Sequence, residues 1–353
     1  MPGSDLQINL ALQGGGSHGA LTWGVLDRLL EEPGLRIAEI SGTSAGAMNA
    51  VVLAHGLAKG GRRGARDALR RFWKTMSDAA RFSPIQRSAW DKLRGDYSLD
   101  NSPGYLMMSW LNQVVSPQML NPFGINPLRD IVAEMIDFDA INAVADLRLH
   151  LCATNVRTGQ PHVFTTGQIS CDAVMASACL PQMYAPVEID GEAYWDGGFA
   201  ANPALSPLIV NSPVRDLLIV QLNPLRRERL PVTAQDIVNR VNEISFNTSL
   251  IKELRVVDML RQLRDGGAVS LIPGADLRLH MIHCETDVQE LSASSKLNAE
   301  WGYLQNLFGR GRVWAQDWLD HHRADIGVRS SFRLEELFVP AERPDALHPL
   351  GEA

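Results

Sequence analysis

The sequence predicts an α/β fold with a mostly parallel sheet, and two early strand–turn–helix units carry this prediction. Residues 6–12 (LQINLAL) form an apolar run that leads into glycines, and residues 19–32 follow with apolar residues at helical spacing. Residues 35–41 (LRIAEIS) form a second apolar run, followed by the small-residue helix pattern of residues 45–58. Strands that alternate with helices in this way pair in parallel, through right-handed crossovers.

Later parts of the chain continue the alternation. Four apolar runs predict further strands: 147–156 and 161–166, which flank RTGQ as a hairpin, and then 216–224 and 277–285. Two segments with helical spacing predict long helices: about 232–264 and 296–322.

Composition narrows the class of protein. The 353 residues are 45% hydrophobic and 21% charged, as in an ordinary globular protein, and the net charge of -7 argues against a general nucleic-acid binder. The four cysteines show no CxxC or zinc-ligand spacing, so we expect reduced thiols. Because no apolar run is long enough to cross a membrane and no signal peptide is apparent, we expect a cytoplasmic protein that meets lipid only at an interface.

The first glycine turn, GGGSHG at residues 14–19, allows three interpretations. It fits GxGxxG through Gly14, Gly16 and Gly19, which is typical of a dinucleotide site. That site needs an acidic residue free at the end of the second strand, whereas Glu39 falls inside the strand. Alternatively, the backbone N–H groups of the glycines converge at a helix N-terminus and form an oxyanion hole. In the third interpretation, the glycines are needed only for the tight turn between the strand and the helix.

The segment GTSAG at residues 42–46 predicts a nucleophile elbow. It lies between a strand and a helix, the context in which a sharp turn exposes a serine. Gly42 and Gly46 are small enough to let Ser44 project from such a turn. The alternative is that Ser44 is only the N-cap of the following helix.

A nucleophilic serine needs a base within hydrogen-bond reach. Five histidines lie late enough to follow the chain order of an α/β-hydrolase, but none is set in a glycine-rich turn: His280, His283, His321, His322 and His348. Asp196, in YWDGGFAANP, ends an apolar run and is followed by Gly197 and Gly198. Apolar flanks favour a desolvated carboxylate, which is a stronger base. A simple Asp-Gly-Gly turn is the alternative.

Taken together, GGGSHGA, GTSAG, ASACLP (176–181) and DGG (196–198) resemble the ordered motifs of the patatin-like phospholipases over about residues 8–225. The resemblance implies a three-layer α/β/α sandwich with a mostly parallel central sheet. It implies a serine acyl hydrolase of lipid esters, with Ser44 as nucleophile and Asp196 as base. The oxyanion hole would be formed by the first turn: Gly14, Gly15, Gly16 and Ser17. The resemblance implies no metal and no cofactor.

Three other hydrolase classes and a binding role stay open at this point. An esterase, a thioesterase or a storage-polyester depolymerase would use the same dyad, and a closed site would make the protein a lipid-binding one. A nucleotide-binding oxidoreductase would leave GTSAG and DGG unexplained.

The resemblance also divides the chain. We expect a patatin-like catalytic domain over 6–225, a mostly helical extension over 226–330 packed on it, and a weakly ordered tail over 331–353. His18 stands where many family members carry Arg or Lys, so we expect it to be an anion or substrate contact whose charge changes near neutral pH.

Two further segments bear on how lipid would reach the site. Residues 102–128 are rich in Met and apolar residues and predict either a lid or acyl-chain wall, or an internal helix. Residues 59–71 concentrate cations, which predicts either transient contact with a membrane surface or a solvated helix face.

Overall fold

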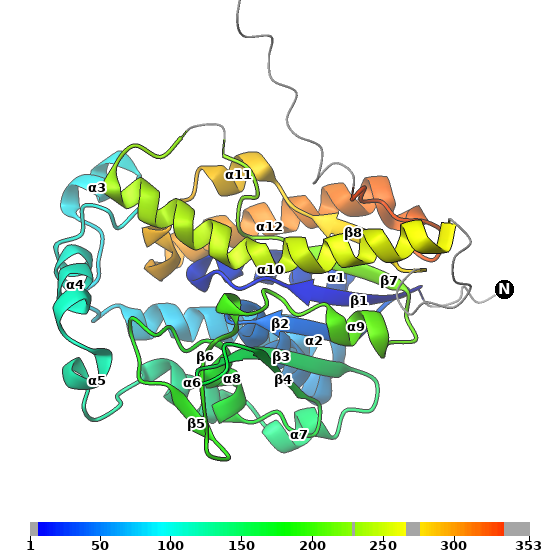
Figure 1. The fold of residues 1–353 in the computed structure, drawn as a ribbon, viewed down its shortest axis with the longest axis horizontal. Coiled ribbons are helices and arrows are strands. Elements are labelled where there is room, and N and C mark those ends of the chain that lie inside the picture. The colour runs from blue at the N-terminus through cyan, green and yellow to red at the C-terminus, as the bar shows by residue number, and fades with distance from the viewer. Residues whose placement is uncertain (1–5, 228–229, 266–275, 335–353) are drawn as a thin grey trace, which may run out of the picture.

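The computed structural model describes residues 6–227, 230–265 and 276–334, and within them one eight-stranded sheet forms the centre of the molecule (Figure 1). Its strands are β1 (Leu6–Leu12), β2 (Leu35–Thr43), β3 (Arg148–Asn155), β4 (Pro161–Thr165), β5 (Val187–Ile189), β6 (Glu192–Asp196), β7 (Asp216–Val220) and β8 (Arg278–Ile282). The order across the sheet is β5-β6-β3-β2-β1-β7-β8, with β4 also paired to β3. The five strands from β3 to β8 along this order are parallel, whereas β4 and β6 pair antiparallel with β3.

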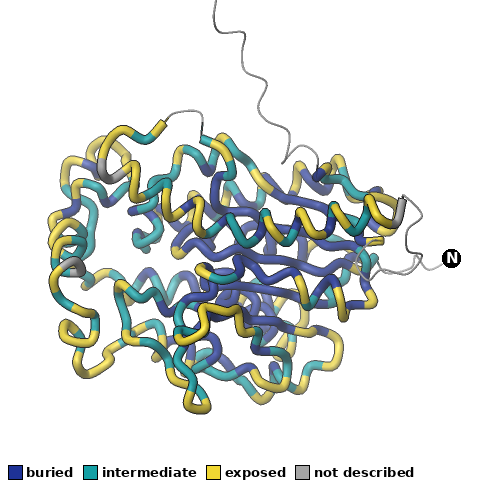
Figure 2. The backbone as a smooth tube through the Cα atoms, viewed as in Figure 1, coloured by how far each residue is buried: buried dark blue, intermediate teal, exposed yellow. Residues whose placement is uncertain are grey.

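Helices cover both faces of this sheet. They are α1 (Gly19–Glu31), α2 (Ala45–Ala80), α3 (Ala89–Arg94), α4 (Pro103–Val114), α5 (Pro117–Leu120), α6 (Pro127–Met135), α7 (Phe138–Asn142), α8 (Cys171–Ser177), α9 (Ser206–Val210), α10 (Ala234–Asp265), α11 (Glu285–Gln289) and α12 (Trp301–His322). Strand β7 shows the two faces. Leu218 and Val220 join the core cluster that includes α1, α2 and α12, whereas Leu217 and Ile219 join the cluster of α9 and α10. Because side chains alternate along a strand, the buried sheet has a core on each side, which the dark central strands of Figure 2 illustrate.

The predicted fold class is confirmed, with a mixed sheet whose strands are mostly parallel. Each predicted strand is present, and the long segment near 232–264 forms α10. The helix predicted from residue 296 begins at Trp301 instead, because the Asn298 side chain accepts the N–H of Glu300 and holds a turn before it. The extension is not only helical, since β8 pairs with β7 and forms an edge of the central sheet.

The segment 102–128 does not form the internal helix that its spacing allowed. It forms α4 and α5, and Leu106, Trp110 and Val114 on α4 are more than half exposed. Met119 and Phe123 are exposed as well, so the apolar side chains of this segment face outward. The lid interpretation stays a prediction.

The basic run 59–71 lies on α2, which bends at Gly60–Gly61. Lys59 pairs with Asp137 at 2.6 Å, and Arg66 pairs with Asp27 at 2.7 Å. Arg62 donates to backbone carbonyls of the α1–β2 connection, including that of Glu32. These cations therefore stabilise contacts between α2 and other parts of the protein. Contact of this run with a membrane surface stays a prediction.

At the C-terminal end, Phe332 and Leu334 pack against the α9–α10 face, and Phe332 donates its N–H to the Leu279 carbonyl of β8. The chain is thus part of the core up to Leu334, although the tail was expected from residue 331. The rest of the predicted tail, 335–353, lies outside the described residues.

Two glycines let the extension approach the first helix closely. A Cβ at Gly24 of α1 would lie 2.1 Å from the Phe308 carbonyl oxygen of α12, and a Cβ at Gly311 would lie 2.0 Å from that of Leu21. Both distances are far shorter than a carbon–oxygen contact permits, so α1 and α12 pack backbone to backbone. We propose that the predicted domain boundary at 225/226 separates two parts of one folding unit.

This proposal makes Gly311→Ala a sensitive test. Overpacking of a tight contact costs about 1–3 kcal/mol, so we expect the free energy of unfolding to fall by that amount, with one transition for the whole chain. Gly309→Ala is the matched control: Gly309 is on the same helix, exposed and open, and alanine there should stabilise by about 0.5–1 kcal/mol. Urea unfolding followed by circular dichroism measures both. A separate transition for the extension would contradict the single unit.

Candidate active site

Ser44 occupies a strained turn between β2 and α2. Its backbone angles are φ 54° and ψ -120°, a region that non-glycine residues adopt rarely and that is often found at functional sites. A Cβ at Gly42 would lie 2.7 Å from the Gly46 carbonyl carbon, and a Cβ at Gly46 would lie 2.2 Å from the Leu12 carbonyl oxygen. The two glycines therefore permit the tight turn and bring the start of α2 against β1.

The register of the sheet brings Asp196 toward this turn. Thr43, which precedes Ser44, pairs with Cys152 on β3, and the next residue, Ala153, pairs with Asp196 on β6. A Cβ at Gly197 would lie 2.1 Å from the Cys152 carbonyl oxygen and 3.0 Å from the Thr43 methyl carbon. Residues separated by about 150 positions in the sequence thus lie on either side of one strand.

The Asp196 carboxylate is fully buried. Its Oδ1 accepts the N–H of Gly198 at 2.8 Å, while Oδ2 has no well-aligned hydrogen-bond partner. Burial raises the pKa of Asp196 to about 6, against the lowering effects of the Gly198 N–H, the Ser44 hydroxyl and the Lys296 charge. The Ser44 hydroxyl is thus among the groups that favour the charged form of the carboxylate, although no aligned hydrogen bond joins the two side chains. Loose geometry of this kind is common for catalytic pairs in the absence of substrate.

The first glycine turn packs against the nucleophile. A Cβ at Gly14 would lie 2.8 Å from the Ser44 Cβ, so the turn borders the site. The Gly14 N–H, however, already donates to Asn202 Oδ1 at 2.7 Å. This corrects the expectation that Gly14 supplies an oxyanion donor. Within the described residues, the N–H groups of Gly15, Gly16 and Ser17 have no hydrogen-bond partner, which leaves them as the candidate donors.

Ser177 supports the elbow, a role that its motif did not reveal. Its Oγ accepts the N–H of Ser44 at 2.9 Å, and the residue is buried in the last turn of α8. The resemblance gave ASACLP only as one of four ordered motifs. The Cys179 carbonyl of the same segment also accepts the N–H of Asp196 at 2.7 Å. One short segment thus holds the backbone of both candidate catalytic residues.

His18 does not fit the role of an anion contact. It is 2% exposed, and its Nε2 lies 2.8 Å from the Ser295 Oγ. Burial, followed by the Lys296 charge, lowers the pKa of His18 well below its usual value, so the ring is neutral at pH 7. The expectation that the charge of His18 changes near neutral pH is therefore wrong. His18 lies at the N-terminus of α1 and contacts Ser295 of the extension.

The other histidines act elsewhere in the described chain. His280 lies on β8, three strands from β2, and bonds to Asp216 at 3.1 Å and to Ser331 at 2.8 Å. His321 and His322 lie at the end of α12, and His348 is outside the described residues. The hydrogen bonds of His280, His321 and His322 go to residues other than Ser44 and Asp196. Glu39 is likewise not free for a ribose, because it pairs with His150 at 2.8 Å inside the sheet.

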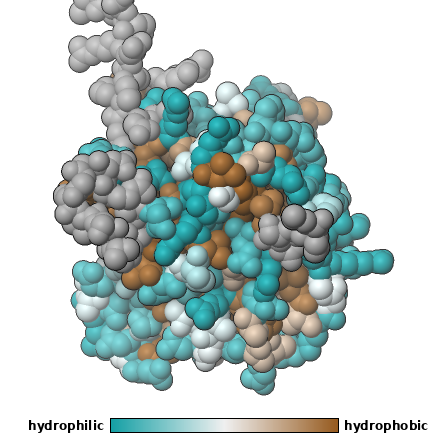
Figure 3. Space-filling model, turned by 90° about the vertical axis from the view of Figure 1, so that its right-hand side faces the viewer, coloured by the Kyte–Doolittle hydropathy of each residue, from teal (hydrophilic) through white to brown (hydrophobic). Residues whose placement is uncertain are grey.

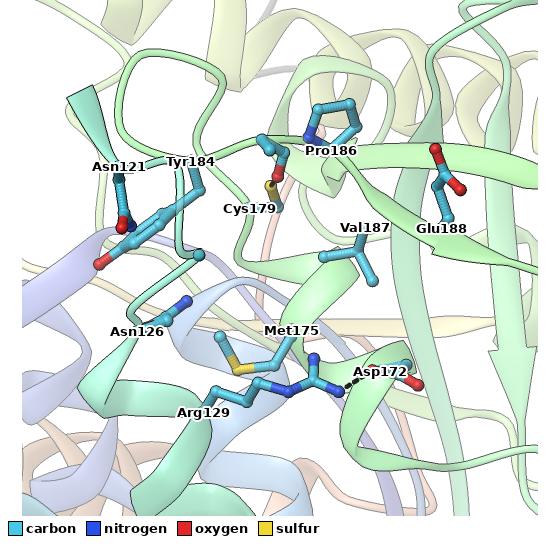
Figure 4. Close-up of a pocket in the computed structure, with 12 residues that line it drawn as sticks. Asn121, Asn126, Arg129, Asp172, Met175, Cys179, Tyr184, Pro186, Val187 and Glu188 are labelled. Carbon is cyan, nitrogen blue, oxygen red and sulfur yellow. Dashed lines mark hydrogen bonds and ion pairs between the residues drawn. The ribbon is translucent and has the colours of Figure 1, made fainter. Parts of the chain in front are cut away.

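A pocket of about 420 Å³ lies beside the segment that holds the elbow (Figure 4). Met175 and Cys179 line it, on either side of Ser177 in the sequence, together with Tyr184 and Val187. Figure 4 shows the Arg129–Asp172 ion pair at one side of this pocket. Neither Ser44 nor Asp196 lines it, so the pocket adjoins the site through the 175–179 segment.

The described residues contain no His, Cys, Asp and Glu grouping that could hold a metal ion. The four cysteines are free thiols. Among the described helices, none is both long and apolar enough to cross a bilayer. The face at the right of Figure 1, turned toward the viewer in Figure 3, mixes hydrophilic residues with smaller hydrophobic areas.

Comparison with known proteins gives a family match and similar solved structures. The family model described as patatin-like phospholipase matches residues 10–209. VipD from Legionella pneumophila is a similar solved structure, with 14% identity, a TM-score of 0.37, and coverage of 86% of this chain and 67% of that one. Full-length ExoU from the type III secretion system of Pseudomonas aeruginosa, solved in complex with SpcU, shows 14% identity, a TM-score of 0.27, and coverage of 86% and 53%. The chain therefore spans about half the length of ExoU.

A serine in a strained turn, a buried carboxylate and a glycine turn lie together on a mostly parallel sheet that is flanked by helices. Because the family model covers more than half of the 353 residues, the chain belongs to the patatin-like phospholipase family. Membership supports lipid hydrolase activity.

Ser177→Ala tests the support of the elbow. The mutation leaves the Ser44 N–H without its acceptor, so we expect a loss of about 1–3 kcal/mol in stability. Displacement of the nucleophile should also lower kcat by roughly 10- to 100-fold. Ser170→Ala is the control, because Ser170 caps the other end of α8 and its loss costs about 1 kcal/mol without touching Ser44. Equal kcat values for the two variants would contradict the role of Ser177.

Proposed function

We propose that the protein is a serine acyl hydrolase of lipid esters that uses a Ser44–Asp196 dyad. One observation carries this proposal. Ser44, in a strained turn, lies near the buried carboxylate of Asp196, whose Oδ2 has no hydrogen-bond partner. Phospholipid or lysophospholipid is the substrate class that we infer from the family.

In this mechanism Ser44 Oγ attacks the ester carbonyl carbon while Asp196 accepts the hydroxyl proton. The carbonyl oxygen becomes an oxyanion, which the N–H groups of Gly15, Gly16 and Ser17 stabilise. Collapse of the tetrahedral intermediate breaks the ester bond, and Asp196 returns its proton to the leaving alcohol. A water molecule, deprotonated by Asp196, then attacks the acyl-enzyme and releases the fatty acid and free Ser44.

Two features of the environment support a carboxylate in the role that histidine usually fills. Desolvation makes Asp196 a stronger base than a solvated aspartate, since its pKa is about 6. The Gly198 N–H also holds the carboxylate, and the Cys179 carbonyl accepts the backbone N–H of Asp196, so the residue is positioned before substrate binds. The pocket beside residues 175–179 offers space for an acyl chain, and its volume is within the usual range of ligand pockets.

The dyad is tested with p-nitrophenyl esters of increasing chain length. We expect Ser44→Ala to lose hydrolysis above background and Asp196→Asn to lose about 10²- to 10⁴-fold in kcat, because general-base catalysis is worth that much. Ser245→Ala and Asp190→Asn, at exposed positions on α10 and in the β5–β6 turn, are matched controls and should keep wild-type rates.

The possible outcomes distinguish the candidate functions and test Asp196 as the base. An active Asp196→Asn with a dead Ser44→Ala would exclude Asp196 as the base. An inert wild type that still binds lipid would favour the closed lipid-binding protein. Faster turnover of thioesters or hydroxyalkanoate polyesters than of glycerolipids would favour a thioesterase or a storage-polyester depolymerase.

The pH profile tests the protonation state of the base. Asp196 must be ionised to accept a proton, so kcat/KM should fall as pH drops through about 6, tenfold for each pH unit below. Initial rates between pH 4.5 and 8 measure this. The same acid limb should persist in His18→Gln, because the Asp196 carboxylate sets it. A fall of kcat/KM centred near the ordinary pKa of aspartate would contradict the proposal that the base is desolvated.

A further inference from the structure

Lys296, in the extension, borders the first glycine turn. It lies in the short 3-10 helix Ser294–Leu297, and a Cβ at Gly16 would lie 2.4 Å from the Lys296 carbonyl oxygen. Gly16 has φ +58°, a backbone conformation that favours glycine, so this position requires a residue without a Cβ. The extension therefore reaches the candidate oxyanion donors directly.

The Lys296 ammonium contacts two residues that border the two halves of the candidate catalytic site. Its Nζ donates to Asn223 Oδ1 at 2.7 Å, and the Asn223 amide donates to the Gly14 carbonyl at 3.1 Å. The same Nζ lies 5.5 Å from the centroid of the Phe246 ring. That ring touches the turn after Asp196, because a Cβ at Gly198 would lie 2.3 Å from Phe246 Cε1.

This partly buried cation has unused hydrogen-bonding capacity. An ammonium has three donors, and within the described chain Lys296 makes one hydrogen bond, to a neutral amide, and no ion pair. Lys59 and Lys74, by contrast, both pair with carboxylates. Because the ammonium forms no ion pair within the described chain and keeps two donors, this arrangement is suited to an anion that arrives with the substrate.

The electrostatic surroundings keep the ammonium charged at neutral pH. Burial lowers the pKa of Lys296 to about 8, while Glu243 and Asp196 act to raise it and Arg227 to lower it. Glu243 is itself held by Arg227 at 2.5 Å and by Arg240 at 3.1 Å. The nearby His18 is neutral, so it does not compete for an anion.

We propose that Lys296 binds the phosphate of the lipid headgroup and thereby selects phosphate-bearing esters over neutral ones. This assignment rests on the proposed hydrolase function of Ser44 and Asp196. A phosphate beside Nζ gains charge-assisted hydrogen bonds from the two unused donors. The ester bond of the same lipid then lies toward Ser44, across the Gly14 turn that packs against it.

The test compares lysophosphatidate with the monoacylglycerol of the same acyl chain, as the ratio of their kcat/KM values. The wild type should prefer the phosphate ester, and Lys296→Met should lower the ratio by roughly 10- to 100-fold. Lys296→Arg keeps the charge and should retain most of the preference. Lys252→Met, at an exposed lysine of the same extension, is the control and should leave the ratio unchanged.

A pH series gives a readout that a purely structural role would not move. In the wild type the ratio should fall as pH rises through about 8, since Lys296 loses its charge there. In Lys296→Arg the ratio should stay level, because guanidinium remains protonated. Binding of the two lipids to Ser44→Ala, with and without Lys296→Met, gives the same comparison without turnover.

Three results would overturn the assignment. Equal slowing of both esters in Lys296→Met would make Lys296 a support for the dyad. An unchanged ratio would exclude any contact with the headgroup. Inhibition of monoacylglycerol hydrolysis by inorganic phosphate that depends on Lys296, with no preference for the phosphate ester, would assign the site to free phosphate. Failure of the proposed function itself is distinct, because wild type and Ser44→Ala would then show equal rates.

Discussion

The arrangement of the site depends on how closely the start of α2 approaches β1. Gly46 lies against the Leu12 carbonyl with no room for a Cβ, and this contact leaves Ser44 in a turn with positive φ. Such a conformation persists only where its surroundings enforce it. Here Ser177 holds the Ser44 N–H, and Thr43 donates to the Ala201 carbonyl at 2.9 Å. The strain of the elbow is therefore offset by hydrogen bonds from two later segments of the chain.

Opposing electrostatic effects set the properties of the carboxylate. Burial alone would keep Asp196 protonated, whereas the Gly198 N–H, the Ser44 hydroxyl and Lys296 each favour its charged form. Their balance leaves a group that is ionised at neutral pH yet more basic than a solvated aspartate. The charge of Lys296 acts on both Asp196 and His18, so a residue of the extension takes part in the electrostatics of the site.

Buried polar contacts connect the extension to the glycine turn. Gln13, at the end of β1, accepts the N–H groups of Leu222 and Asn223 at 2.9 and 3.1 Å, and donates to Asn247 of α10 at 3.2 Å. Buried polar groups are costly when unpaired, so these residues hold one another in place. Together with β8 and the contact between α1 and α12, this network makes the extension a part of the sheet, the core and the site.

The sequence by itself determined the alternation of strands and helices, because apolar periodicity and glycine turns are local signals. It also predicted that Ser44 lies in the turn between a strand and a helix and that Asp196 ends a strand, as the structure has them. Only the tertiary structure decided that Gly14 gives its N–H to Asn202, that His18 is buried and neutral, and that α4 faces outward. It alone joined Ser177 and Lys296 to the site. These features depend on burial and on partners far away in the sequence, and no local pattern encodes either.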